Sequence, residues 1–382
     1  MSTSELAEHL GYLTDKTRLE AYRSALCEIV RPDSVVLDLG AGTGLLGLLA
    51  AQAGARRVYA VDGGPILELS RLVAWRSELG DRIVHIRGLS TRIDLPERVD
   101  VVVCDQIGGF VHDAGILGYY ADAVARFLKP GGVLIPGSFR LCLTPIDDEQ
   151  LERRVADWRS GPDGLDFTPF ADAAANTEHH VNAPAGCALG PEAVIAEITA
   201  DHDSHFGGSV ELPIERPGRV CGVLGTFVAR MSPSVTLTNA PWADQPMNRW
   251  QNFYPFAEAS DVDAGDRVEA SIDVSPRNGM VAWRGRIVRA DGASGPSFAH
   301  DTLQGSFAGP RAIIRSSDKW TPSPTEHVPV ARSVLDSLDA TRSIDDLARL
   351  VREAHPGQFV SQHHARSFVR SVLGPVVHPS EG

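Results

Sequence analysis

Residues 35–47 read VVLDLGAGTGLLG, the most informative pattern in the chain. An apolar run ends at Asp38, and glycines at alternate positions from Gly40 then form a turn into an apolar helix pattern. Glycines suit this turn because a bound ligand must lie against backbone that carries no Cβ. Asp62 ends the next β-rich run, where it can accept hydrogen bonds from two ribose hydroxyls. The pattern predicts a nucleotide at the carboxyl ends of two parallel strands.

The glycine spacing distinguishes two kinds of nucleotide. The Rossmann dinucleotide fingerprint is G-x-G-x-x-G, whereas this chain has G-x-G-x-G from Gly40, with Asp38 two positions before it. That carboxylate can meet the ammonium of an amino-acid tail, which a pyrophosphate would disfavour. We therefore predict S-adenosylmethionine as the cofactor rather than NAD. The alternative is that the glycines only make a tight strand-to-helix turn.

Composition narrows the class of protein. The chain has 382 residues, of which 43% are hydrophobic and 22% charged, so two or three globular domains are expected. A net charge of −13 argues against a general binder of nucleic acid or of an anionic membrane. Five scattered cysteines without a CxxC pair favour reduced thiols in the cytoplasm over a zinc site. No apolar run is long enough to span a membrane, and the N-terminus lacks the features of an export signal.

The pattern of predicted helices and strands changes along the chain. Strand and helix patterns alternate through residues 1–137, which predicts an α/β Rossmann-like domain with a parallel sheet and an N-terminal helix. Short strands separated by Gly, Pro and Asp fill 138–316 and predict an all-β barrel domain. A partly helical insertion occupies about 150–190. A proline-rich linker leads to a small helical extension at 325–382, in which Ser343 begins a capping box.

Several segments resemble protein arginine N-methyltransferases. HLGYLTDKTRLEAY (9–22) is similar to their N-terminal signature H-x-x-M-L-x-D-x-x-R-x-x-x-Y, with Tyr12 in place of methionine. FLKPGGVLIP resembles the end of their α/β domain, and WADQPMNRWQNFYPF (242–256) the barrel segment that holds a T-H-W motif. The resemblance spans about residues 9 to 315. It implies S-adenosylmethionine-dependent methyl transfer, and a homodimer or higher homo-oligomer in which the insertion at 150–190 is the dimerisation arm.

The resemblance also implies how the cofactor is held. Arg18 would pair with the methionine carboxylate of the cofactor, and Asp62 would hold its ribose. Leu89 and Ser90 stand where the family has Val-Glu against the adenine, so Ser90 keeps a hydrogen-bonding oxygen but loses the charge. The predicted cofactor-binding set is His9, Arg18, Asp38, Gly40, Gly42, Asp62, Gly63, Leu89, Ser90 and Asp105.

The acceptor side departs from the family. CDQIGGFVHDAG (104–115) aligns with S-E-x-M-G-Y-x-L-x-x-E, whose two glutamates clamp a guanidinium bidentately. Asp105 takes the place of the first glutamate, and Ala114 that of the second. Asn248-Arg249-Trp250 replaces T-H-W, and a buried Arg249 would repel a substrate guanidinium. The donor site is kept while the arginine-binding site is lost.

The sequence therefore predicts a methyltransferase that acts on a small molecule of specialised metabolism, such as an indole or aromatic amine methylated on carbon or nitrogen. Natural-product enzymes of this family that lack the second glutamate, the indole C3-methyltransferases among them, are the nearest type by resemblance. Asp105, His112 or Asp113 would be the base, and Arg249 and Trp250 complete the predicted catalytic set.

Two other functions remain open. Asp105 allows a protein or peptide arginine N-methyltransferase, and the third hypothesis is a cofactor-binding scaffold without turnover. No metal is predicted, because the acids and histidines of DHDSH (201–205) are expected to be solvated. The acceptor, the methylated atom and the identity of the base stay undetermined at this level.

Overall fold

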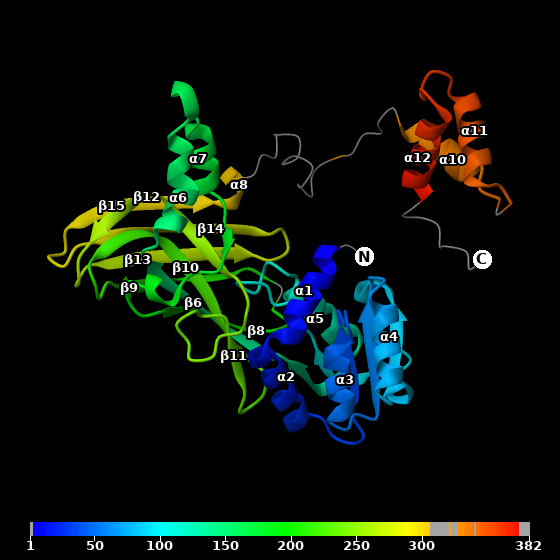
Figure 1. Ribbon diagram of the computed structural model, residues 1–382, viewed down its shortest axis with the longest axis horizontal. Coiled ribbons are helices and arrows are strands. Elements are labelled where there is room, and N and C mark those ends of the chain that lie inside the picture. Colours follow the sequence, from blue (N-terminus) through cyan, green and yellow to red (C-terminus); the bar gives the residue numbers. More distant parts are fainter. Residues whose placement is uncertain (1–2, 203, 306–320, 322–326, 340, 374–382) are drawn as a thin grey trace. The chain divides into compact units, whose positions relative to one another are not determined.

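The computed structural model describes residues 3–202, 204–305, 321, 327–339 and 341–373. The chain divides into two compact units, residues 1–307 and 308–382. The expected end of the barrel domain at 316 and the start of the extension at 325 lie outside the described residues. Both expected sheet domains belong to the first unit (Figure 1).

The first sheet is parallel throughout, with the strand order β3-β2-β1-β4-β5. Its strands are β1 (Val35–Leu39), β2 (Arg57–Asp62), β3 (Ile83–Arg87), β4 (Val99–Val103) and β5 (Leu128–Ile135). Helices α1 (Thr3–Thr14) and α2 (Lys16–Ile29) precede the sheet, and α3 (Leu45–Gln52), α4 (Leu67–Arg76) and α5 (Ile116–Arg126) connect its strands.

The position of β1 in this sheet locates the site. Every residue of β1 is buried, as expected for a central strand covered by helices on both faces. The chain moves outward from β1 to β2 and β3, then returns to place β4 on the other side of β1. Ligands of such sheets bind outside the carboxyl ends of the strands at this reversal. The glycine turn after β1 and Asp105 after β4 therefore lie at the same edge.

Two antiparallel sheets form the barrel-like domain, which confirms the expected α/β-plus-barrel architecture. One sheet has the order β7-β12-β10-β6-β8, with β11 beside β10, and the other β15-β14-β13-β9. Alternate residues of β13 are buried, so one face of that strand packs on the core. The strands are β6 (Ser138–Ile146), β7 (His179–Val181), β8 (Ala193–Thr199), β9 (Phe206–Pro213), β10 (Gly218–Arg230), β11 (Thr236–Thr238), β12 (Gln251–Val262), β13 (Arg267–Ser275), β14 (Met280–Val288) and β15 (Ser294–Asp301).

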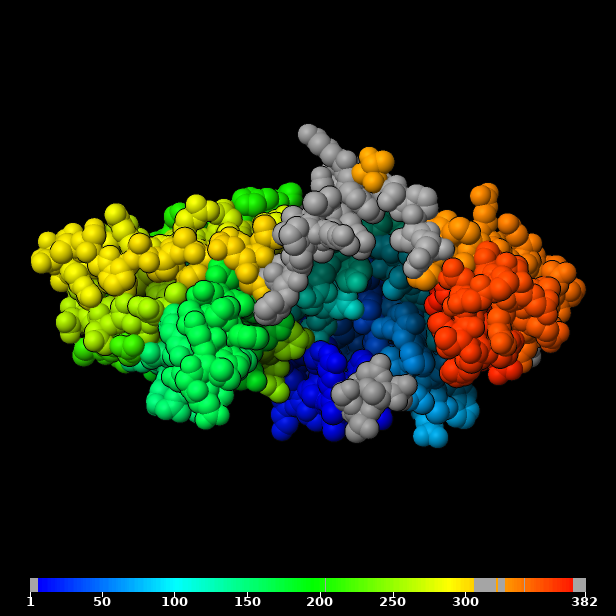
Figure 2. All heavy atoms as spheres, turned by 90° about the horizontal axis from the view of Figure 1, so that it is seen from above, coloured from blue at the N-terminus to red at the C-terminus, as the bar shows by residue number. Residues whose placement is uncertain are grey.

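A helical excursion interrupts the barrel between β6 and β7, within the insertion expected at 150–190. Helices α6 (Glu149–Ala156) and α7 (Thr168–Ala175) stand out from the barrel surface (Figures 1 and 2). Trp158, Leu165 and Phe170 on this excursion are 43%, 60% and 45% exposed. Large apolar side chains exposed together in this way are typical of an interaction surface.

The second unit has a small hydrophobic core of its own. Helices α10 (Val328–Asp336), α11 (Ile344–Ala354) and α12 (Gln362–Leu373) bury Val334, Val351 and Val369 between them. The capping box expected at Ser343 begins α11, because the Ser343 hydroxyl and the Asp346 carboxylate each bond the other residue's backbone N–H. No helix within the described ranges is long and apolar enough to cross a membrane.

Candidate functional site

The turn after β1 has the backbone shape that its glycines allow. Gly40, Gly42 and Gly44 have φ angles of +74°, +51° and +78°, a region that side chains with a Cβ rarely adopt. Asp38 is buried beneath the turn, where its Oδ2 accepts a hydrogen bond of 2.7 Å from the Gly47 N–H. Its Oδ1 is buried without a hydrogen-bond partner. An unpaired buried carboxylate oxygen is costly, and a ligand cation that reached it would offset this cost. Asp38 itself lines none of the three pockets described below.

Burial has a strong effect on Asp38. Desolvation raises the pKa of its carboxyl to about 7, although the Gly47 N–H opposes the shift. Asp62 and Asp105 add to the increase by charge repulsion, and Arg18 reduces it. The carboxyl is therefore poised between its two protonation states near neutral pH, and a ligand ammonium would favour the ionised form.

Two pockets meet at the Asp62 carboxylate. A pocket of about 300 Å³ and one of about 240 Å³ share Gly40, Asp62 and Gln106 in their walls. Asp62 Oδ2 accepts from the Gly42 N–H at 2.8 Å, and Oδ1 from the Gly64 N–H at 2.6 Å. Each oxygen keeps a lone pair for a ligand hydroxyl. The arrangement suits a nucleoside in which the sugar lies at Asp62, between a base on one side and a tail on the other.

The smaller pocket contains the residues expected around the adenine. Gly63, Leu89 and Ser90 line it together with Tyr119. Ser90 is buried, and its backbone carbonyl accepts a hydrogen bond from the Arg126 guanidinium at 2.5 Å. Leu89 is 51% exposed at the rim. Leu39 and Val61 add further apolar surface to this pocket, and with the Tyr119 ring they suit a planar base.

The larger pocket contains the residues expected around the methionine tail. Arg18 is 4% exposed; its Nε donates to Asp105 Oδ2 at 2.6 Å and its Nη1 to the Tyr12 carbonyl at 3.0 Å. His9 contacts the glycine turn, since a Cβ on Gly42 would lie 2.9 Å from the His9 ring. Both His9 and Arg18 line the pocket, and helices α1 and α2 thus cover the glycine turn.

Asp105 is shared by two guanidinium groups of this chain. Its Oδ2 accepts from Arg18 and also from Arg249 Nη2 at 3.2 Å. Its Oδ1 accepts from the Tyr22 hydroxyl at 3.0 Å. Burial lowers the pKa of Arg249, but the Asp105 carboxylate and two neighbouring tyrosines together outweigh burial and raise it. Both Asp105 oxygens are therefore already engaged by internal donors.

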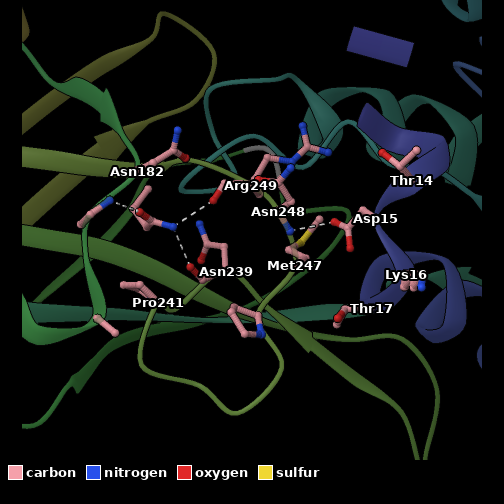
Figure 3. A pocket seen from close by; sticks show the side chains of 14 residues that line it. Thr14, Asp15, Lys16, Thr17, Asn182, Asn239, Pro241, Met247, Asn248 and Arg249 are labelled. Atoms are coloured by element: carbon pink, nitrogen blue, oxygen red, sulfur yellow. Dashed lines mark hydrogen bonds between the residues drawn. The ribbon is translucent and has the colours of Figure 1, made fainter. Parts of the chain in front are cut away.

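Arg249 also separates the larger pocket from a third, polar one. This third pocket has a volume of about 600 Å³ and lies between the start of α2 and the barrel (Figure 3). Arg249 lines both pockets, and Asn248 beside it donates its backbone N–H to Asp15 Oδ2 at 2.7 Å. Asp15 in turn caps α2 by accepting from the Arg18 N–H. Through Asp15, the loop before β12 is thereby connected to the start of helix α2, which helps to cover the glycine turn.

The remaining predicted residues separate into two groups. Trp250 lines the larger pocket, as does Ala114. His112 and Asp113 line none of the pockets named here. His112 is buried, and the Asp113 side chain is 4% exposed. Burial lowers the pKa of His112, but Glu178, Asp113 and a backbone carbonyl together outweigh burial and raise it.

The Asp113 carboxylate has its own partners. Burial raises its pKa, but His180, His112 and backbone N–H groups together hold it well below its ordinary value. The structure thus brings Asp105, Arg249 and Trp250 together at the pocket, and leaves His112 and Asp113 outside it.

Some functional residues were not anticipated from the sequence. Gln106 lies in the wall of both cofactor pockets, and its position directly after Asp105 at the end of β4 is a signal that could have found it. Glu8 lines the larger pocket and accepts from the Tyr12 hydroxyl at 2.6 Å. Glu178, which bonds His112 at 3.1 Å, carries no local motif.

Comparisons with known proteins agree with this geometry. Residues 16–137 match the family model described as ribosomal protein L11 methyltransferase (PrmA). Protein arginine N-methyltransferase 6 of Danio rerio is 34% identical over 177 residues, which cover 45% of this chain and 51% of that protein. Protein arginine N-methyltransferase PRMT10 of Arabidopsis thaliana is 27% identical over 303 residues, covering 69% of this chain and 78% of the relative. The chain thus spans about half the length of the zebrafish relative.

Solved structures show the same architecture. The crystal structure of Arabidopsis thaliana protein arginine methyltransferase 10 matches with a TM-score of 0.67 and 23% identity, over 78% of this chain and 98% of that one. The Trypanosoma brucei PRMT1 enzyme–prozyme heterotetrameric complex with AdoHcy matches with a TM-score of 0.68 and 22% identity, over 76% and 97%.

These similarities decide some of the expectations from the sequence. They confirm the expected fold. The match of residues 16–137 to a methyltransferase family model agrees with the expected S-adenosylmethionine-dependent methyl transfer. The bacterial indole-methylating subtype is not shown. The names of the relatives support the alternative of a protein arginine acceptor better than a small molecule.

Proposed function

We propose that this chain, similar in sequence and fold to the protein arginine methyltransferases, transfers the methyl group of S-adenosylmethionine to a small acceptor that carries no guanidinium. The observation that supports this acceptor class is the state of Asp105. Its carboxylate is bound by Arg18 and Arg249 of the chain itself. Ala114 supplies no second carboxylate on the same pocket wall.

Charge makes a guanidinium a poor acceptor in this pocket. Arg249 is 5% exposed, and a second cation beside it would be repelled with little screening by water. A neutral amine or an electron-rich aromatic carbon meets no such repulsion. Tyr12 and Trp250 add aromatic surface to the same wall, which suits a planar acceptor.

A protein arginine acceptor is the second candidate. The relatives that bear this name favour it, and Asp105 would be the carboxylate that receives the guanidinium. For that function, Arg249 would have to leave Asp105 when the acceptor enters. An indole or aromatic amine requires no such displacement.

The donor supplies a methyl group that its sulfonium already activates. The chain contributes alignment, and well-oriented reactants can gain about 7–11 kcal/mol from it. Asp62 would hold the ribose, and Arg18 would hold the carboxylate of the donor. Of the three predicted bases, Asp105 alone lines the pocket, so we assign to it any proton that the acceptor loses. Oδ1, which only Tyr22 engages, is the oxygen with the freer lone pair.

The oligomeric part of the proposal is a homodimer formed through the helical excursion. Its exposed apolar side chains need a partner surface, and α4 offers one. Leu69, Leu72, Val73 and Trp75 on α4 are 47%, 43%, 44% and 72% exposed. In a two-fold dimer, the helical excursion of each copy can cover α4 of the other copy, so that both apolar patches of each chain are buried.

The test is a methyl-transfer competition with isotopically labelled donor. The purified chain would be offered indoles and aromatic amines in one series and arginine-rich peptides in another. The proposal expects label in the small molecules only. Label in the arginine peptides alone would establish the second candidate, whereas donor binding without transfer to either series would indicate a scaffold without turnover.

A further inference from the structure

Behind the pocket, the Asp113 carboxylate is the centre of a hydrogen-bond cluster. Its side chain is 4% exposed and accepts from the backbone N–H groups of Gly109, at 2.9 Å, and Phe110, at 3.2 Å. Trp250 Nε1 donates to Asp113 Oδ2 at 3.2 Å, and His180 Nε2 lies 3.2 Å from the same oxygen. One carboxylate thus connects the loop that follows β4, the loop that precedes β12, and strand β7.

The Trp250 indole is held on its edge and on its face. Asp113 binds the edge through the indole N–H. The His180 ring stacks on the indole with a centroid distance of 5.3 Å and an interplanar angle of 25°. Gly109 packs so closely that a Cβ there would lie 2.4 Å from Trp250 Cδ1. Since Trp250 lines the larger pocket, these contacts determine the shape of that wall.

The charges around His180 favour its protonated form. The contact with Asp113 raises the pKa of His180, burial opposes this, and Glu178 raises it further. His112, the other histidine of the cluster, lowers it by repulsion. Glu178 itself bonds His112 and accepts from Asn252 Nδ2 on β12 at 3.1 Å. Each histidine of the cluster thus has a carboxylate partner that raises its pKa.

We propose that His180 is a positioning residue, which fixes Trp250 in the pocket wall through its stack on the indole and its bond to Asp113. His180 lines neither cofactor pocket, so it acts through Trp250 rather than on donor or acceptor. The role rests on the proposed function, because Trp250 matters only if an acceptor occupies the larger pocket. Deprotonation of His180 weakens the ionic bond to Asp113 and loosens the indole.

The test follows the fluorescence of Trp250 and needs no acceptor. A protonated imidazole in contact with an indole quenches its emission by accepting an electron. The spectrum of the full chain minus that of Trp250→Phe isolates this residue, and we expect its intensity to rise with pH at a midpoint above that of an ordinary histidine. His180→Gln should abolish the step. His179→Gln is the matched control, because His179 faces away and bonds the Ala174 carbonyl at 2.9 Å.

Two outcomes would overturn the role of His180. One is a difference spectrum that does not titrate, and the other is a titration that persists unchanged in His180→Gln. If Trp250→Phe does not fold, 19F spectra of the 5-fluorotryptophan-labelled chain replace it. One tryptophan signal should then titrate in the unmodified chain and in His179→Gln, and stop titrating in His180→Gln. A chain that binds no donor would refute the proposed function while leaving this titration in place.

Discussion

Binding of the donor should release a proton from Asp38. Desolvation places the pKa of this carboxyl at about 7, and its Oδ1 is buried without a partner. A ligand ammonium that pairs with the ionised form lowers the pKa in the complex. If the pKa of Asp38 in the complex is well below 6, donor binding releases about 0.9 proton at pH 6 and about 0.5 proton at pH 7. Affinity should accordingly fall as the pH is lowered, approaching a tenfold loss per pH unit.

The assay is calorimetry of S-adenosylhomocysteine binding in buffers of different ionisation enthalpy, at pH 6 and pH 7. Asp38→Asn is the necessary comparison, because it removes the titrating carboxyl and keeps the size of the side chain. This variant should bind with an enthalpy that no longer depends on the buffer. Equal proton release by Asp38→Asn and the unmodified chain would exclude Asp38 as the source of the proton, as would no release by either.

Asp38 makes folding stability depend on pH in the direction opposite to that of most carboxylates. A group whose pKa is raised in the folded state binds more protons there than in the unfolded chain, so stability decreases as pH rises between the two pKa values. For Asp38 this window runs from its ordinary value of 3.8 to about 7. Donor binding near neutral pH relieves this cost, and thermal melting should therefore show greater stabilisation by donor at pH 7 than at pH 6.

Three further perturbations have defined outcomes. Asp62→Ala removes two ribose hydrogen bonds of about 1.5 kcal/mol each, so calorimetry should show donor affinity about 150-fold weaker. The exposed Asp33→Ala is the matched control. Equal donor affinities of the two variants would contradict the assignment of Asp62 to the ribose. Trp75→Glu places a charge on the exposed face of α4 and should convert dimers to monomers in sedimentation, whereas an unmodified chain that is already monomeric would exclude the dimer. Arg249→Met should cost less than about 2 kcal/mol in denaturant unfolding, because Asp105 keeps its bonds to Arg18 and Tyr22; a loss twice as large would show that Arg249 is essential to the fold.

The donor half of the site could be predicted from sequence because its determinants are local. The turn at Gly40 and the carboxylate of Asp62 follow directly from where two buried strands end. In a parallel sheet those ends meet at one edge, so Asp105 after β4 could be placed beside them without knowledge of side-chain packing. The resemblance at 9–22 then supplied Arg18.

The acceptor half depends on contacts that no local pattern encodes. Val111 has a φ of +72°, which is rare for a β-branched residue and reverses the loop before His112. That reversal directs His112 to Glu178, which is 66 positions away in the sequence. Arg249 was expected to repel an acceptor, and its pairing with Asp105 across 144 positions could not be inferred from either residue alone.

A crystal structure of the full chain with S-adenosylhomocysteine would show directly how the donor site and Asp105 are occupied. We expect the adenine in the pocket at Leu89 and Ser90, the ribose hydroxyls on Asp62, and the homocysteine carboxylate at Arg18, with Arg249 still bound to Asp105. A product nucleotide located elsewhere, or a complex in which Arg249 has left Asp105 free for a guanidinium, would contradict this expectation.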